Sequence, residues 1–115
     1  YKLINMSVTD RNDALVEVFK AKTVAVGSPT FNKDVLPSIA PLCTDIKGLG
    51  FKNKQGAAFG SYGWSGESVP KIEEHLEEAG FDMIGEGLKC EWQPSVEKAE
   101  ECRAFGKQLA RSTRA

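Results

Sequence analysis

The sequence predicts an α/β fold, a doubly wound parallel sheet with helices on both faces. Short apolar runs alternate with longer stretches in which apolar residues recur at helical spacing. Short connections join them, and such alternation is typical of parallel strands linked by right-handed crossovers. Two of the strand-to-helix loops carry the same mixture of glycine, hydroxyl and aromatic residues. Parallel strands end at one edge of a sheet, so we expect these loops to meet there.

In the N-terminal part we expect a short strand at residues 2–6. A helix should follow at residues 13–20, with Asn12 or Asp13 as its N-cap. Residues 23–26 form a continuous apolar run that ends at a glycine. A run without alternation is typical of a strand buried on both faces of a parallel sheet, and that is the prediction for this segment.

The next helix is expected at residues 34–46, where Pro41 should introduce a kink and Gly48 and Gly50 should end the helix. Residues 56–59 predict another strand, and their small side chains would let helices pack closely against it. A further helix is expected at residues 68–79, because apolar residues fall on one stripe at helical spacing.

Gly80 follows that helix and suits the left-handed position just after a helix end. An interrupted last strand is expected at residues 81–84 and 88–92, and the alternation in its second part predicts a half-exposed edge. Ser95 should cap a final helix that runs to about Arg111.

Composition favours one compact domain over residues 1–115, with 41% hydrophobic and 27% charged residues. The formal net charge is −1, and lysine and arginine are scattered, so a nucleic-acid partner is not expected. No apolar run approaches the roughly 20 residues of a membrane helix, so a membrane partner is not expected either.

The chain contains few thiol and imidazole groups for metal binding or redox chemistry, namely three cysteines and one histidine. Cys43, Cys90 and Cys102 are widely spaced and form no C-x-x-C pair. They are expected to be small buried apolar residues of a protein in the reducing cytoplasm. His75 is the one histidine and lies among glutamates in a helical stretch, so this chain is not expected to assemble a metal centre by itself.

The two loops at the predicted sheet edge are the candidate binding site. They comprise Ser28, Pro29, Thr30, Phe31 and Asn32 in the first loop, and Ser61, Tyr62, Gly63, Trp64, Ser65 and Gly66 in the second. Glycines allow the backbone to approach a ligand closely, and aromatic side chains can stack on a flat ring. These features predict a flavin mononucleotide (FMN) site, although glycine, serine and proline are also ordinary turn residues.

Along its whole length the sequence resembles the flavodoxin-like domain of flavodiiron proteins, the A-type flavoproteins that include rubredoxin:oxygen oxidoreductases and flavorubredoxins. The matching stretches are VGSPTFN at 26–32, LPSIAPL at 36–42, NK at 53–54, AFGSYGWSG at 58–66 and WQP at 92–94. The string GSYGWSG is the specific one. The resemblance implies FMN bound by the two loops, with Trp64 near the ring.

The resemblance also implies electron transfer as the function. In the family, FMN accepts electrons from a rubredoxin-like donor and passes them to a diiron centre that reduces oxygen or nitric oxide. That centre lies in a separate metallo-β-lactamase-like domain, reached across a homodimer. The sequence contains none of that domain, so this chain alone is expected to be part of an oxidoreductase without a complete active site. No catalytic residue is expected in it, since electron transfer through a flavin needs no acid or base.

One departure from the family pattern concerns the N-terminus. Flavodoxin-like sheets have strand order 2-1-3-4-5. The first strand and its phosphate loop are expected before Tyr1, which would leave a gap of about 10 Å between residues 2–6 and 23–26. Losing two charge-assisted phosphate bonds costs roughly 3–6 kcal/mol. Weak or absent FMN binding is therefore expected of this chain alone. The expected explanation of the missing strand is that the chain is a fragment of a longer protein, and the alternative is that two copies exchange elements to fill the gap.

Three other functions compete with this interpretation. A free-standing flavodoxin-like electron carrier shares the cofactor, but flavodoxins are usually strongly acidic. A non-catalytic flavodoxin-like interaction domain without cofactor would fit the expected loss of the phosphate loop. A hydrolase is disfavoured, because residues 63–67 lack the last glycine of G-x-S-x-G.

Overall fold

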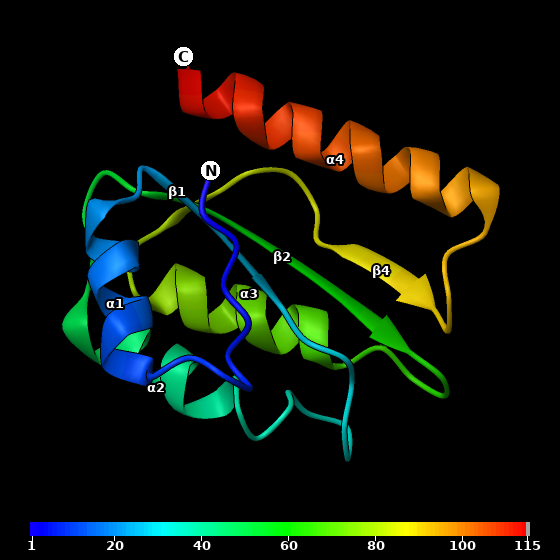
Figure 1. Ribbon diagram of the computed structural model, residues 1–115, viewed down its shortest axis with the longest axis horizontal. Coiled ribbons are helices and arrows are strands. Elements are labelled where there is room, and N and C mark those ends of the chain that lie inside the picture. The colour runs from blue at the N-terminus through cyan, green and yellow to red at the C-terminus, as the bar shows by residue number, and fades with distance from the viewer. Residues whose placement is uncertain (115) are drawn as a thin grey trace.

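The computed structural model describes residues 1–114, which form four helices and four strands (Figure 1). In chain order they are α1 (Arg11–Lys20), β1 (Thr23–Gly27), α2 (Ala40–Leu49), β2 (Gln55–Tyr62), α3 (Ser68–Glu78), β3 (Asp82–Met83), β4 (Leu88–Glu91) and α4 (Val96–Arg114). The predicted α/β fold with a parallel sheet is confirmed.

The sheet is built around β2, and every strand pair in it is parallel. On one side β1 pairs with β2 from Thr23↔Gln55 to Gly27↔Phe59. On the other side β3 pairs with the start of β2, and β4 pairs with its end, from Phe59↔Leu88 to Tyr62↔Glu91. The interrupted last strand is therefore confirmed, and β1, β2 and β4 end at one edge of the sheet.

The two faces of the sheet are covered unequally. Helices α1, α2 and α3 lie on one side, where the core contains fully buried residues such as Ile46, Ile72 and Leu76. Helix α4 lies apart from them, over β4, and has no fully buried residue within its described length (Figure 1). Its last turn also reaches the start of β1, where the Thr113 and Thr23 hydroxyls are 2.6 Å apart.

Strand β1 is buried on one face, so the prediction that both faces are buried was wrong. Val26 is buried against the helices, whereas Ala25, which points to the opposite face, is exposed. The reason is the position of α4, which packs along β4 and meets β1 at its first residue.

Residues 2–6 do not form the predicted strand. Ile4 and Met6 pack against the core, but β2 is the one described strand that pairs with β1, and no ladder includes residues 2–6. A strand needs a neighbour for its backbone groups, and none of the described strands provides one here. The segment ends in a turn in which the Asn5 side chain accepts a hydrogen bond from the Ser7 N–H (2.9 Å).

Two helix starts differ from the prediction. Helix α1 begins at Arg11, because the Asp10 carboxylate accepts a hydrogen bond from the Asn12 N–H (2.8 Å) and is the N-cap. Helix α2 begins at Ala40, after turns at residues 36–39, so Pro41 stands in its first turn and causes no kink. N–H groups in the first turn of a helix have no intrahelical acceptor, so proline, which has no N–H, loses no hydrogen bond there.

The other helix ends agree more closely with the prediction. Gly50, with φ +66°, follows the last residue of α2 as predicted, but Gly48 lies inside the helix, so its placement at the end was wrong. Gly80 has φ +98° just after α3, as predicted. The Ser95 hydroxyl accepts a hydrogen bond from the Lys98 N–H (3.1 Å) and caps α4, which was also predicted.

The core cysteine predicts a loss of stability at alkaline pH. Burial, and to a lesser degree the Asp34 carboxylate, raises the pKa of the Cys43 thiol from 9.0 to about 11. The unfolded chain therefore ionises first, so this contribution to stability is complete below pH 9 and is lost as pH rises to 11. The loss should reach about 2 kcal/mol at pH 11. Urea unfolding of the native chain and of Cys43→Ala at pH 8 and pH 11 measures it. An equal decline in both proteins would contradict the prediction.

Candidate functional site

The two candidate loops lie side by side at the carboxyl edge of the sheet. The ladder between β1 and β2 continues into them, because the Ser28 N–H donates to the Phe59 carbonyl (3.2 Å) and the Thr30 N–H donates to the Ser61 carbonyl (2.8 Å). The predicted meeting of the loops is confirmed. Their relative position is therefore fixed by backbone hydrogen bonds that extend the sheet.

A buried hydroxyl network holds the first loop to the start of α3. The Ser68 hydroxyl donates to the Ser28 carbonyl (2.9 Å) and accepts from the Thr30 hydroxyl (3.0 Å). The Thr30 hydroxyl in turn accepts from the Ser68 N–H (3.2 Å), and the Ser28 hydroxyl accepts from the Leu36 N–H (2.8 Å). Ser28 and Ser68 are both buried. The Ser28 side chain therefore stabilises the loop.

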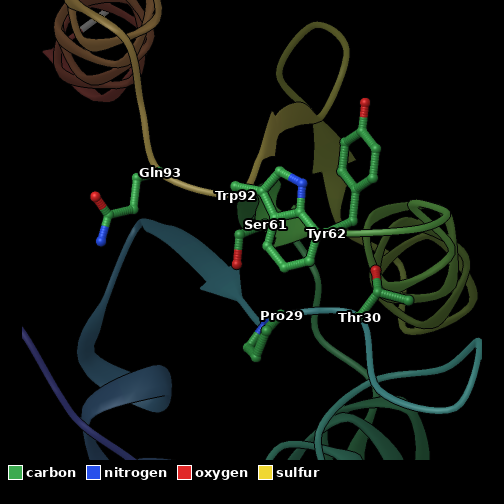
Figure 2. Close-up of a pocket in the computed structure, with 7 residues that line it drawn as sticks. Pro29, Thr30, Ser61, Tyr62, Trp92 and Gln93 are labelled. Atoms are coloured by element: carbon green, nitrogen blue, oxygen red, sulfur yellow. The ribbon is translucent and has the colours of Figure 1, made fainter.

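Between the loops lies a hollow of about 360 Å³, which we call the loop hollow (Figure 2). It is lined by Pro29, Thr30, Ser61, Tyr62, Gly63, Trp92 and Gln93. Its size falls in the range of small-molecule sites. Of the predicted site residues, the structure brings together Pro29, Thr30, Ser61, Tyr62 and Gly63 around this hollow.

Trp92, which sequence reasoning did not place in the site, forms one wall of the loop hollow. The backbone N–H of Trp92 donates to the Tyr62 carbonyl (2.7 Å), and the backbone of Trp92 is left-handed, with φ +54°. Its indole lies against Gly63, where an added Cβ would stand 2.4 Å from the ring. Figure 2 shows the indole over the end of β2, near Ser61 and Tyr62. In the sequence, Trp92 stands at the end of a predicted strand. That position alone does not place it beside Tyr62, because the placement depends on β4 being the neighbour of β2.

The remaining predicted residues do not line the loop hollow. Phe31 and Asp34 exchange backbone hydrogen bonds around Asn32 and Lys33, which have φ +50° and +60°. This tight turn, of the kind found in hairpins, carries Phe31 and Asn32 away from the hollow. Trp64 is 96% exposed. Contact of these residues with a ligand stays a prediction.

Ser65 and Gly66 belong to the supporting structure of the second loop. Gly66 lies against the Tyr62 ring, with an added Cβ 3.3 Å from it. A hydrogen bond from the Ser65 hydroxyl lowers the pKa of the Glu67 carboxyl, and the nearby Lys33 and Lys89 charges lower it further. No lysine or arginine is among the residues that line the loop hollow within the described chain.

The chemistry of the loop hollow fits a flat, polar-edged ring. The aromatic rings of Tyr62 and Trp92 can cover ring faces, and Thr30 and Ser61 add hydroxyls and backbone groups at its margin. The hollow also lies outside the carboxyl ends of the strands, where ligands bind in open α/β sheets.

Comparison with known proteins establishes the family. The family profile described as Flavodoxin matches residues 2–106. The chain belongs to the flavodoxin family. Proteins of this family bind FMN, and the predicted likeness to the flavodoxin-like domains of flavodiiron proteins is confirmed.

Three relatives show how this flavodoxin domain compares with longer and shorter proteins. It is 44% identical over 110 residues to the anaerobic nitric oxide reductase flavorubredoxin of Aeromonas hydrophila, covering 96% of this chain and 22% of that protein. The rubredoxin oxygen:oxidoreductase of Desulfovibrio gigas superposes with a TM-score of 0.93 at 37% identity, covering 98% of this chain and 28% of that one. A flavodoxin from the domain Archaea superposes with a TM-score of 0.86 at 29% identity, covering 99% and 78%.

Two further observations concern metals and membranes. Within residues 1–114 of the flavodoxin domain, no three histidine, cysteine, aspartate or glutamate residues lie close enough to hold a metal ion. Over the same residues, no helix has the length and apolar character needed to cross a membrane.

The contact between the loops predicts that Gly60 cannot accept a side chain. A Cβ there would stand 2.3 Å from the Ser28 carbonyl oxygen and 2.8 Å from the Ser68 hydroxyl. We expect Gly60→Ala to lower the free energy of unfolding by about 1–3 kcal/mol, because backbone must move. Urea unfolding followed by circular dichroism measures the change.

Gly48→Ala is the matched control, since nothing lies within 4 Å of a Cβ at this position in α2. It should raise the free energy of unfolding by up to about 1 kcal/mol, the helix propensity of alanine over glycine. Equal effects of the two substitutions would contradict the close contact at Gly60.

Proposed function

We propose that this flavodoxin domain binds the flavin ring of FMN in the loop hollow and transfers electrons as part of a larger flavodiiron-type oxidoreductase. The observation that carries the proposal is the loop hollow itself. It lies at the strand ends of a flavodoxin-family sheet and has an aromatic residue from each of two strand ends, Tyr62 and Trp92. FMN would supply one- and two-electron transfer there, and the surrounding groups would tune its potential.

The residues of the loop hollow would have distinct roles. Trp92 and Tyr62 would stack on the ring, and Gly63 would keep the space that the indole occupies. Thr30 and Ser61 would bond the polar edge of the ring through hydroxyl or backbone groups. Trp64, which the family resemblance places near the ring, is exposed and would have to fold over the hollow when ligand binds.

The phosphate of FMN should add little to binding by this chain. The residues lining the loop hollow include no lysine or arginine, and the Thr30 hydroxyl is already bonded to Ser68. Tight phosphate recognition depends on charge-assisted bonds or on several convergent N–H donors. We therefore propose that the ring, and not the phosphate, provides the affinity of this chain for FMN.

Parallel titrations with FMN and riboflavin test the ring site. Both should bind with similar affinity and quench flavin and tryptophan fluorescence in a saturable way, because both present the same ring. A folded sample that binds neither would overturn the proposal for this chain. Binding of FMN that is more than about tenfold tighter than that of riboflavin would reveal phosphate contacts worth about 1.4 kcal/mol or more.

Replacing the aromatic wall tests where the ring lies. Trp92→Ala should weaken riboflavin binding about five- to tenfold, the value of an aromatic stack. Trp64→Ala is the comparison variant. Because Trp64 lies outside the loop hollow in this structure, its loss should weaken riboflavin binding less than the loss of Trp92. A larger loss of affinity in Trp64→Ala than in Trp92→Ala would place the ring against Trp64 and contradict the proposed position.

For the whole protein we propose a rubredoxin-like electron donor, a diiron metallo-β-lactamase-like domain as acceptor and a homodimer that brings the two together. The names of the Aeromonas and Desulfovibrio relatives support a rubredoxin-like donor, and the small share of their length that this chain covers supports a further domain in the whole protein. Iron analysis of the intact parent protein tests it, with about two iron atoms per chain expected.

A free-standing electron carrier is the second candidate function. It is favoured by the archaeal flavodoxin, of which this chain covers 78%. An intact parent protein that binds FMN but no iron would support the carrier.

A further inference from the structure

A second hollow lies between α4 and the sheet, which we call the α4 hollow. It has a volume of about 380 Å³, and its lining includes Phe59, Leu88, Cys90, Trp92 and Cys102. Two of the three cysteines of the chain therefore face one space from two different elements. This differs from the sequence-based prediction that all three cysteines are buried, because Cys90 and Cys102 are partly exposed free thiols.

The orientation of both cysteines follows from the elements that carry them. Successive side chains of a strand alternate between its faces, so Leu88 and Cys90 lie on the same face of β4, and both line the α4 hollow. Cys102 belongs to the half-buried stripe of α4 that faces the sheet and also includes Ala99 and Phe105. Each thiol is thus directed toward the element that carries the other.

Lys98 lies one turn before Cys102 on α4. The pKa of Lys98 is raised, first by its hydrogen bond to Glu101 (2.7 Å) and to a smaller extent by the Cys90 and Cys102 sulfurs. A thiolate is the nucleophile in disulfide exchange. Cys43 is 1% exposed, and burial raises the pKa of its thiol, which keeps it protonated and unreactive.

The packing of α4 leaves room for the adjustment that a disulfide requires. Cα atoms of bonded cysteines lie about 4.4–6.8 Å apart. Helix α4 has no fully buried residue within its described length, so a movement of α4 toward β4 displaces no fully buried side chain of the helix. The connection at residues 92–95 is irregular and can absorb such a shift.

We propose that Cys90 and Cys102 are a disulfide-forming pair that reacts with low-molecular-weight disulfides and fastens α4 to the edge strand β4. One thiolate attacks the small disulfide, forms a mixed disulfide and releases one small thiol. The other cysteine gives up its proton, attacks the bound sulfur, forms the Cys90–Cys102 bond and releases the second small thiol. The two protein thiols are oxidised and the small disulfide is reduced to two thiols, so atoms and electrons balance. The reaction does not depend on flavin binding.

The test is incubation of the folded chain with oxidised glutathione, followed by thiol counting in denaturant, intact mass and tryptic mapping. The three free thiols should fall to one, and the mass should fall by two hydrogens. Trypsin cleaves after Lys89, Lys98 and Arg103, so residues 90–98 and 99–103 should appear as one cross-linked peptide. Cys43 should remain in residues 34–47 as a free thiol.

Variants separate this pair from general cysteine reactivity. Cys43→Ser should form the same cross-link, and Cys90→Ser should stop at a stable mixed disulfide on Cys102. In urea, Cys43 should react as well, because the fold no longer protects it. Mixed disulfides on Cys90 and Cys102 without a cross-link, a bond to Cys43, a disulfide-linked dimer or no reaction in the folded chain would each overturn the proposal.

Discussion

The parallel ladder between β1 and β2 is the interaction on which the rest of this domain depends. It begins in the core, beside the buried Ala57 and Ala58, and continues through Ser28 and Thr30 into the loops that form the loop hollow. On the other side of β2, Trp92 extends the pairing of β4 in the same way. A slip of one residue would turn Phe59 into the core and Ala58 out of it, so core packing also fixes the register of the site.

The unequal covering of the sheet divides the molecule into two physical environments. On the side of α2 and α3, small residues of β2 allow close packing, and Cys43 is shielded from solvent. On the side of α4, Phe59 remains 41% exposed, and the space beside it is the α4 hollow. The loop hollow lies where these environments meet, with Tyr62 and Trp92 contributed from adjacent strands.

The sequence predicted well those features that depend on local pattern. The interrupted edge strand, the caps at Ser95 and Gly80 and the meeting of two loops at the strand ends all follow from periodicity and turn chemistry. The features it missed depend on neighbours. Residues 2–6 have strand-like composition but no partner strand among the described residues. In β1, one face is exposed because none of the described helices packs along it.

The candidate site shows the same division. The first loop lies beside the second at the strand ends, as predicted, but after its tight turn at Asn32 and Lys33 it contributes neither Phe31 nor Asn32 to the lining of the hollow, which residue types alone do not reveal. Trp92 was missed as a site residue because its role arises from the pairing of β4 with the end of β2, a contact between distant parts of the chain.

The contact of Trp92 with Gly63 has a consequence for sequence variation. An indole in this place excludes even a methyl group at position 63, because that carbon would overlap the ring. The two positions therefore cannot vary independently. A smaller residue at position 92 would release position 63 from glycine, and the pair should covary among flavodoxin domains that keep this arrangement of strand ends.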